Sequence, residues 1–363
     1  MKIGLLGGGQ LGRMLALAGY PLGLRFRVLD LSPEAPAGQL AELMVADFND
    51  TDALKRFASG LDLVTYEFEN VPVDTARFLN RRVTVYPPPE ALESAQDRLV
   101  EKSFFERLGI PTPPFVRVDT WDDLKAAVAR IGLPSVLKTR RFGYDGKGQF
   151  ILENAEDAPH AWQSLGGVPL ILEGFIDFER EVSVIAVRGR AGEVKFYPLV
   201  ENHHERGILR LSLSPAPGAI SELQSEAEDY ARRAMTELNY VGILAIEFFQ
   251  KDGRLLANEM APRVHNSGHW TIEGAETSQF ENHLRAIIGM PLGSTSAVGY
   301  SAMLNLIGKI PDPRPVYNMP DAHLHLYGKA VRPNRKVGHI TLRASTAELL
   351  GEQLDRLRNS LEL

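Results

Sequence analysis

The sequence predicts an α/β protein of three domains, and three changes of pattern along the chain support this prediction. Residues 1–98 open with an apolar strand, a glycine-rich turn, a helix and a second strand, which form the βαβ unit of a Rossmann-like domain. Residues 99–295 combine helices with strands of period-two alternation, which is typical of an α+β domain. Residues 296–363 hold further strand-forming segments and a terminal amphipathic helix, so we expect a small β-rich C-terminal domain.

Composition and charge exclude several classes of function. Of the 363 residues, 44% are hydrophobic and 24% are charged, and a net charge of -6 leaves no basic surplus for nucleic acid. The absence of cysteine excludes disulfides, thiolate nucleophiles and zinc–thiolate sites. No apolar run approaches the ~20 residues that cross a bilayer, and the first residues are typical of a strand rather than a signal peptide. We therefore expect a cytoplasmic protein that binds neither nucleic acid nor membrane.

The first glycine-rich turn, "GGGQLG" at Gly7 to Gly12, leaves three interpretations open. It fits the dinucleotide fingerprint G-x-G-x-x-G, and Asp30 ends the next strand about 20 residues later. It would equally serve another phosphorylated ligand, because such a turn brings a phosphate close to a helix N-terminus. The third interpretation is a structural turn without a ligand.

The remaining elements follow in order along the chain. Residues 62–72 predict a strand with Glu67, Glu69 and Asn70 at its carboxyl end, and "VTVYPPP" predicts another strand. One helix is expected from residue 93 to a stop before Pro111, followed by the extended "FVRV". Further strands are expected at residues 134–139, 148–153, 169–176, 179–189 and 194–204, a helix at 221–239, a hairpin at 241–263 and strands within 323–345.

A second glycine-rich segment, "RRFGYDGKGQF", follows the strand that carries Lys138. Gly143, Gly146 and Gly148 allow consecutive N–H groups to face one anion, and Lys147 adds a cation. The spacing is not that of a P-loop. On this segment alone an ordinary hairpin turn is the favoured interpretation, because Asp-Gly is a common turn dipeptide.

The predicted hairpin "IEFFQKDGRLLANEM" carries Glu247 and Glu259 in otherwise apolar strands, where an unpaired buried carboxylate is costly. Two interpretations remain: the pair holds magnesium, or Glu247 pairs with an arginine or lysine of the core. A two-residue turn would oppose Glu247 to Asn258 and send Glu259 to the other face. A three-residue bulged loop would oppose Glu247 to Ala257 and leave the carboxylates diagonal neighbours, ~7–8 Å apart. The magnesium interpretation is therefore predicted to require the bulged turn.

In order, these features are a lysine with a glycine-rich flap, the segment "LEGFI" and a two-carboxylate hairpin ending in "NEMAPR". They resemble the ATP-grasp superfamily, in which the nucleotide lies between two α+β subdomains. Several ATP-grasp ligases have Asn two residues after the second glutamate, where this sequence has Ala261. That departure, with "YEFENV", "GYDGKGQ", "ENHHERGIL", "APRVHNSGHW" and "YGKAVRPNRKVGH", resembles the 5-(carboxyamino)imidazole ribonucleotide synthase family of purine biosynthesis. The resemblance covers essentially the whole chain, although the family usually has Pro where Val264 stands here.

The resemblance implies two substrate sites and a metal site. For ATP it implies Arg98, Lys138, Gly143, Tyr144, Asp145, Gly146, Lys147, Gly148, Gln149, Glu173, Gly174, Phe175, Ile176, Glu181, His204, Asn258 and Glu259. For one or two magnesium ions it implies Glu247 and Glu259. For 5-aminoimidazole ribonucleotide it implies Gln10, Leu11, Glu67, Arg263, His265, Asn266, Lys329, Arg332, Arg335 and Lys336, with Lys329 and Arg335 as the phosphate clamp. Without the resemblance, the four cations between Lys329 and Lys336 are more typical of a solvent-exposed surface.

The resemblance implies a reaction in three steps. ATP phosphorylates bicarbonate to carboxyphosphate, carboxyphosphate releases carbon dioxide, and the exocyclic amine captures the carbon dioxide. Arg263 and His265 would hold bicarbonate, Lys147 would lie beside the transferred phosphate, and Asp145 would position or deprotonate the amine. Asp145 could instead serve only to form the turn.

The family also implies a homodimer. Three rival hypotheses are a formate-dependent phosphoribosylglycinamide formyltransferase-like ATP-grasp ligase, an NAD-dependent oxidoreductase, and a nucleotide-sensing module without turnover.

Overall fold

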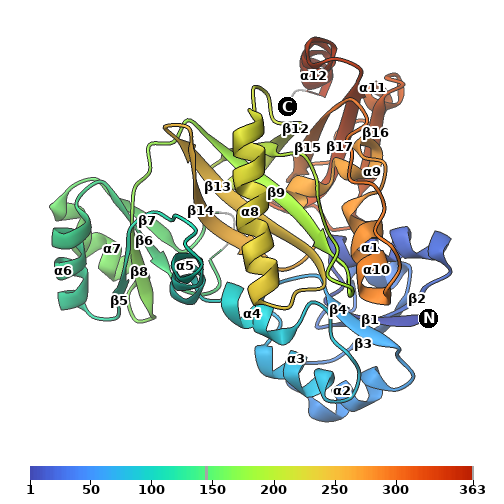
Figure 1. Cartoon of the computed structure of the whole chain (residues 1–363), viewed down its shortest axis with the longest axis horizontal. Helices are drawn as coiled ribbons and strands as arrows, with labels where there is room; N and C mark the ends of the chain where they lie inside the picture. Colours follow the sequence, from blue (N-terminus) through green and yellow to red (C-terminus); the bar gives the residue numbers. More distant parts are fainter. Residues whose placement is uncertain (144–145, 362–363) are drawn as a thin grey trace.

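The structure is a computed structural model that describes residues 1–143 and 146–361 (Figure 1). Its N-terminal part is a parallel four-stranded sheet of order β3-β2-β1-β4, the Rossmann-like arrangement that the βαβ pattern predicts. The strands are β1 (Lys2–Leu6), β2 (Arg25–Asp30), β3 (Glu42–Val45) and β4 (Leu63–Tyr66), with helices α1 (Gln10–Gly19), α2 (Thr51–Ala58) and α3 (Val73–Asn80). The segment "VTVYPPP" forms only an isolated bridge, from Val85 to Val64, instead of the predicted strand.

The predicted helix at residues 93–110 is wrong as one element, since it is two helices, α4 (Pro89–Ala95) and α5 (Arg98–Arg107). Asp97 separates them with an extended backbone, and its carboxylate accepts the Leu99 N–H at the start of α5. The same carboxylate binds the guanidinium of Arg140 through bonds of 2.9 and 2.7 Å. This long-range ion pair fixes the break, which local helix propensity does not reveal, and it sets Arg98 at the first position of α5.

A small antiparallel sheet of order β5-β8-β6-β7 carries the second glycine-rich segment. Its strands are β5 (Phe115–Val118), β6 (Ser135–Thr139), β7 (Gln149–Leu152) and β8 (Leu170–Gly174). Helices α6 (Trp121–Ile131) and α7 (Ala158–Leu165) bury their apolar faces against this sheet, and α6 begins with a capping box between Thr120 and Asp123. Figure 1 shows this unit standing apart from the rest of the molecule at the left.

The largest sheet has nine strands and joins the central and C-terminal parts, because β12 pairs with β15. Its path is β14-β13-β9-β11-β12-β15-β17-β16, with β10 paired to β9. The strands are β9 (Arg180–Arg188), β10 (Val194–Phe196), β11 (Val200–Glu205), β12 (Ile208–Ser214), β13 (Gly242–Lys251), β14 (Arg254–Ala261), β15 (Tyr300–Ile307), β16 (Ala322–Leu326) and β17 (Lys336–Ala344). The predicted strand 194–204 is two strands, interrupted around Pro198, which has no N–H for a ladder.

Helices cover the large sheet and join it to the N-terminal part. They are α8 (Ser221–Glu237), α9 (Thr271–Gly274), α10 (Gln279–Ile288), α11 (Arg314–Tyr317) and α12 (Ala347–Leu361). One buried core includes side chains of β1, α1, α10 and β13, so the Rossmann-like part packs directly on the large sheet. Within the described ranges, no helix is long and apolar enough to cross a membrane. The boundaries between the three predicted domains stay a prediction.

Candidate active site

Three cavities adjoin one another where the three sheets meet. We name them the inter-sheet cavity, about 250 Å³ between the small sheet and the β13–β14 hairpin, the central cavity, about 230 Å³, and the basic cavity, about 990 Å³. The inter-sheet and central cavities share Arg98, His204, Gly207, Glu247 and Glu259. Gln10 and Lys336 line both the central and basic cavities, and Gly146 and Lys147 line both the basic and inter-sheet cavities.

The β13–β14 hairpin brings the two glutamates together by a different route from the one predicted. Lys251 pairs with Arg254 across a two-residue turn, Asp252 and Gly253 at φ 48° and 70°, so the predicted three-residue loop is wrong. The ladder instead shifts within the strands. Glu247 opposes Glu259 while Phe248 opposes Ala257, which leaves Asn258 as the extra residue of a β-bulge. The carboxylates are therefore direct cross-strand partners on one face, closer than the predicted diagonal pair.

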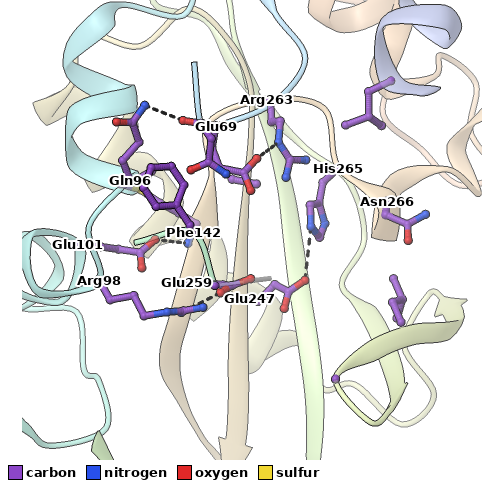
Figure 2. Close-up of a pocket in the computed structure, with 18 of the residues that line it drawn as sticks. Glu69, Gln96, Arg98, Glu101, Phe142, Glu247, Glu259, Arg263, His265 and Asn266 are labelled. Atoms are coloured by element: carbon purple, nitrogen blue, oxygen red, sulfur yellow. Dashed lines mark hydrogen bonds and ion pairs between the residues drawn. The ribbon is translucent and has the colours of Figure 1, made fainter. Parts of the chain in front are cut away.

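The paired carboxylates suit a divalent cation. Glu259 accepts a hydrogen bond from Arg98 at 3.1 Å, and Glu247 lies 3.5 Å from Nε2 of His265 (Figure 2). Burial raises the pKa of Glu247 to about 7; the charge of His204 opposes this shift and that of Glu259 adds to it. The buried Oδ1 of Asn258 has no hydrogen-bond partner among the described residues, so it is a further oxygen donor at this point.

Those residues do not form a complete metal site by themselves. Among the described residues, no group of three or more histidine or carboxylate side chains is arranged to hold a metal ion. Two carboxylates with open space beside them fit magnesium that keeps water or ligand oxygens, which is its usual habit in phosphate-transfer sites. The predicted alternative, a core arginine or lysine on Glu247, is replaced in the structure by the contact with His265.

The inter-sheet cavity collects most of the residues predicted for ATP. Its lining includes Arg98, Lys138, Gly146, Lys147, Gln149, Glu173, Gly174, Phe175, Ile176, Glu181, His204, Asn258 and Glu259. Gly143 lines the central cavity instead, Gly148 lines none of the three, and Tyr144 and Asp145 lie outside the described residues. The apolar lining of this cavity includes Phe178 and Phe249, whose rings stack 4.8 Å apart, and neither was predicted.

One buried ion pair and one half-buried pair of side chains organise the polar part of this cavity. Lys138 donates to Glu173 at 2.8 Å, and both side chains are almost fully buried. Glu181 and His204 are hydrogen-bonded at 2.6 Å. Burial lowers the pKa of His204, but the bond to Glu181 and the charge of Glu247 outweigh it, so the pKa lies above its ordinary value. The cavity therefore presents Lys138 and His204 in positions that neighbouring carboxylates already fix.

The described end of the second glycine-rich segment packs against the turn between β11 and β12. Gly146 has φ 76°, and a Cβ there would lie 2.7 Å from the carbonyl oxygen of Arg206. Gly148 has φ 71°, and a Cβ there would meet Oγ1 of Thr139 at 2.5 Å. Both positions exclude larger residues on steric grounds. The glycines thus hold Lys147 between the small sheet and the basic cavity.

The central cavity contains the residues predicted to hold bicarbonate. Figure 2 shows Arg263 directed at Glu69, with Nε 2.6 Å from the carboxylate, and His265 directed at Glu247. Burial would raise the pKa of Glu69, yet Arg263 lowers it to about 2, so the pair stays charged. Burial and the charge of Arg263 lower the pKa of His265 to about 3, which keeps this imidazole neutral. Asn266 lines the same cavity and exchanges hydrogen bonds with Asn305.

The first glycine-rich turn is already bound by the protein's own carboxylates. Glu67 accepts the N–H groups of Gly9 and Gly12 at 2.7 and 3.1 Å, and Asp30 accepts that of Gly8 at 2.7 Å. Glu67 is buried and lines none of the three cavities. Its predicted contact with the ribonucleotide stays a prediction, whereas its contacts hold the turn that presents Gln10 and Leu11 to the central cavity.

The basic cavity brings together all four cations of the run "YGKAVRPNRKVGH". Its lining contains Lys329, Arg332, Arg335 and Lys336, together with Arg206 and Arg210 from the β11–β12 hairpin. Lys329 donates to the side-chain oxygen of Gln10, so the C-terminal loop touches the first glycine-rich turn. The two hairpin arginines were not predicted. The segment "ERGILR" could have indicated them, because Arg206 directly precedes Gly207 and Arg210 follows it by three residues.

Comparison with known proteins places this architecture in a family. Three family models match consecutive segments: a ribonucleotide synthetase preATP-grasp domain at residues 1–96, an ATP-grasp domain at 103–280, and a phosphoribosylaminoimidazole carboxylase C-terminal domain at 301–353. The N5-carboxyaminoimidazole ribonucleotide synthase of Pseudomonas aeruginosa is 56% identical over 362 residues, covering 100% of both chains. The chain belongs to the N5-carboxyaminoimidazole ribonucleotide synthase family. This is the family that the sequence motifs resemble.

Solved structures of this family share the fold. The N5-carboxyaminoimidazole ribonucleotide synthetase of Thermus thermophilus is 64% identical, with 99% of each chain covered and a TM-score of 0.96. The Aspergillus clavatus synthase, solved in complex with ADP and 5-aminoimidazole ribonucleotide, is 32% identical, with 99% of this chain and 98% of that chain covered and a TM-score of 0.93. The predicted α/β class with an ATP-grasp centre is thereby confirmed.

Proposed function

We propose that the protein is an ATP-dependent ligase that carboxylates the exocyclic amine of 5-aminoimidazole ribonucleotide, giving N5-carboxyaminoimidazole ribonucleotide, ADP and phosphate. The family membership and the relative solved with ADP and this ribonucleotide support the reaction. One observation of the structure carries it. The paired carboxylates Glu247 and Glu259 line both the inter-sheet and the central cavity, so a phosphoryl group can pass from a nucleotide in one to an acceptor in the other.

We assign ATP to the inter-sheet cavity. Lys138 and Arg98 neutralise phosphate oxygens, backbone groups of Phe175 and Ile176 meet the adenine edge, and Glu181 accepts from the ribose hydroxyls. Glu247 and Glu259 would hold magnesium, which neutralises charge on the transferred phosphoryl group when it is bound. Lys147 lines this cavity and the basic cavity, and it adds a cation beside the transferred group.

We assign bicarbonate, the proposed co-substrate, to the central cavity. A bicarbonate oxygen attacks the γ-phosphorus of ATP, the bond to ADP breaks, and carboxyphosphate forms. Arg263, charged and fixed by Glu69, and the neutral His265 stabilise its oxygens. Carboxyphosphate then releases phosphate and carbon dioxide, and the amine nitrogen attacks the carbon and loses a proton. Asp145, outside the described residues, is the proposed positioning group or base for that proton.

We assign the 5′-phosphate of the ribonucleotide to the basic cavity, with Lys329 and Arg335 as its clamp and Arg332 and Lys336 beside them. Gln10 lines both this cavity and the central one, which places the ribose and base between them. The dinucleotide hypothesis is disfavoured, because Glu67 and Asp30 already accept the N–H groups that would bind a pyrophosphate.

The decisive experiment measures phosphate release from ATP and magnesium, with and without the ribonucleotide and bicarbonate. We expect release that requires the ribonucleotide, together with a carbamate product. Release with formate and glycinamide ribonucleotide instead would favour the formate-dependent ligase, and nucleotide binding without turnover would favour the sensing module.

We also propose that the protein is cytoplasmic and forms a homodimer. Exposed apolar side chains in the C-terminal part, such as Tyr317 and Val331, support the homodimer, and light scattering of the purified protein tests it.

A further inference from the structure

Glu173 is a buried acid that is surrounded by cations. Its side chain is 2% exposed, and one oxygen, Oε2, lies 2.8 Å from Nζ of Lys138 and 3.6 Å from Nζ of Lys102. Burial by itself would raise the pKa of this carboxyl, but the charges of Lys102, Lys138 and Arg98 lower it to about 2. Glu173 therefore carries a full negative charge at the wall of the inter-sheet cavity.

The two lysines approach the same oxygen of that carboxylate, but only one of them lines the cavity. Lys138, on β6, lines the inter-sheet cavity together with Glu173. Lys102, on α5, is 0% exposed, lines none of the three cavities and donates to the carbonyl oxygen of Ala257 at 3.1 Å. A ligand in the cavity can therefore meet Lys138 directly, whereas Lys102 can act on that ligand only through Glu173.

We propose that Lys102 is a positioning residue for nucleotide binding, which holds the charge of Glu173 from behind so that Lys138 can donate to the nucleotide phosphates. This inference rests on the proposed function, since it needs a nucleotide in the inter-sheet cavity. Without Lys102, one cation fewer faces Glu173, and the carboxylate holds Lys138 more tightly. The charge of Glu173, then balanced by one cation fewer, also repels the phosphates across a buried, weakly screened path.

A double-mutant cycle tests the inference, with Mg-ADP binding measured by calorimetry. In Lys102→Met we expect the dissociation constant to rise at least about tenfold, because one buried cation is lost. The KM for the ribonucleotide is expected to stay within about twofold, because its phosphate is assigned elsewhere. In a Glu173→Gln background, where Lys102 has no carboxylate to hold, the same Lys102→Met change should alter the dissociation constant by less than about twofold.

Phe105→Leu is the matched control, because Phe105 is a fully buried residue of the same helix, α5, without a charge. It should lower the melting temperature and leave Mg-ADP affinity unchanged. Unchanged affinity in Lys102→Met, or an equal loss of affinity from Lys102→Met in the Glu173→Gln background, would overturn the inference. If Lys102→Met does not fold, the double variant is compared with Glu173→Gln alone: dissociation constants within about twofold of each other support the inference, and a double variant at least about tenfold weaker overturns it. Ribonucleotide-dependent turnover of the wild type is measured separately, so failure of the proposed function is distinguishable.

Discussion

The inter-sheet and basic cavities both collect cations, yet they are built in contrasting ways. In the inter-sheet cavity Lys138 and Glu173 lie on adjacent strands, β6 and β8, and their overall exposures are only 8% and 1%. In the basic cavity the cations lie on the loop after β16, at the first residue of β17, on the β11–β12 hairpin and on the second glycine-rich segment, and Arg332 and Lys147 are exposed. Among the described residues, Glu205 is the one acidic residue that lines it.

The contrast teaches how one molecule prepares for two phosphorylated ligands. Buried charges must be paired before the ligand arrives, because an isolated buried charge is too costly. Such pairs hold the reacting phosphate in a fixed geometry, and salt screens them only weakly. Exposed cations cost little without partners and attract an anion over a longer distance, but salt screens them. We therefore expect the inter-sheet cavity to govern chemistry and the basic cavity to govern capture of the ribonucleotide.

The largest effect is expected where the inter-sheet and central cavities meet. Glu247→Gln keeps the shape of the side chain but removes a charge from the proposed metal pair, so ribonucleotide-dependent phosphate release should fall by about 100-fold or more. Raising the magnesium concentration should recover part of the loss. A variant that retains wild-type release would show that Glu247 serves only as the partner of His265.

A smaller and more selective effect is expected in the basic cavity. Lys329→Met should raise the KM for the ribonucleotide by at least about tenfold, since a charge-assisted phosphate contact is lost, and it should leave the KM for ATP within about twofold. Arg314→Met removes the same charge from an exposed arginine that lines none of the three cavities, and it is the matched control. Equal changes in both KM values would contradict the division of labour between the cavities.

The junction of the two cavities can be disturbed at Gly146. Gly146→Ala adds a Cβ against the Arg206 carbonyl at a positive φ, and we expect kcat/KM to fall by about tenfold. Gly132→Ala is the control, because Gly132 also has a positive φ, 86°, with open space around it. The control should cost stability without loss of kcat/KM. Similar losses in both variants would assign the effect to backbone strain alone.

The salt dependence of the two KM values should distinguish the basic cavity from the inter-sheet cavity without any mutation. Raising ionic strength from about 50 to about 300 mM should increase the KM for the ribonucleotide several-fold and the KM for ATP less, because buried pairs are screened less than exposed cations. Steady-state kinetics at constant free magnesium measure both values. A larger effect on ATP would reverse the comparison.

The stability of the fold should depend on pH through a buried histidine, His283. His283 is fully buried between β4 and β13, where Nδ1 accepts the Ile243 N–H at 3.1 Å and Nε2 lies 2.9 Å from Oγ1 of Thr65. Burial lowers its pKa from 6.5 to about 3, so the unfolded chain binds the extra proton first. Its contribution to stability is therefore complete above pH 6.5 and falls as the pH drops towards 3.

Replacing this histidine measures that contribution. Between about pH 7.5 and about pH 5.5 the wild type should lose about 1.4 kcal/mol from this group, and His283→Gln should lose that much less over the same interval. Urea unfolding at the two pH values gives both numbers. An equal pH dependence in the two proteins would show that folding does not lower the pKa of His283.

The sequence by itself determined the order of most helices and strands and the kinds of residue at each site. Hydrophobic periodicity is a property of a single segment, so the βαβ unit, the β13–β14 hairpin and helix α8 could be read locally. Motif resemblance added the family and the residue types for ATP, metal and ribonucleotide. The hairpin pattern indicated Glu247 and Glu259 before the resemblance, which added the phosphate role of the run from Lys329 to Lys336, and the structure brings each set together.

The tertiary structure decided which partners meet. The bulge at Asn258, which makes Glu247 face Glu259, depends on register between two strands and not on the turn sequence. The break before α5 depends on Arg140, 43 residues from Asp97, and the turn at Gly9 depends on Glu67, 58 residues away. Lys102 and Glu173 likewise meet only across the fold. Charge pairing and desolvation act through space, so a pattern along the chain cannot assign them.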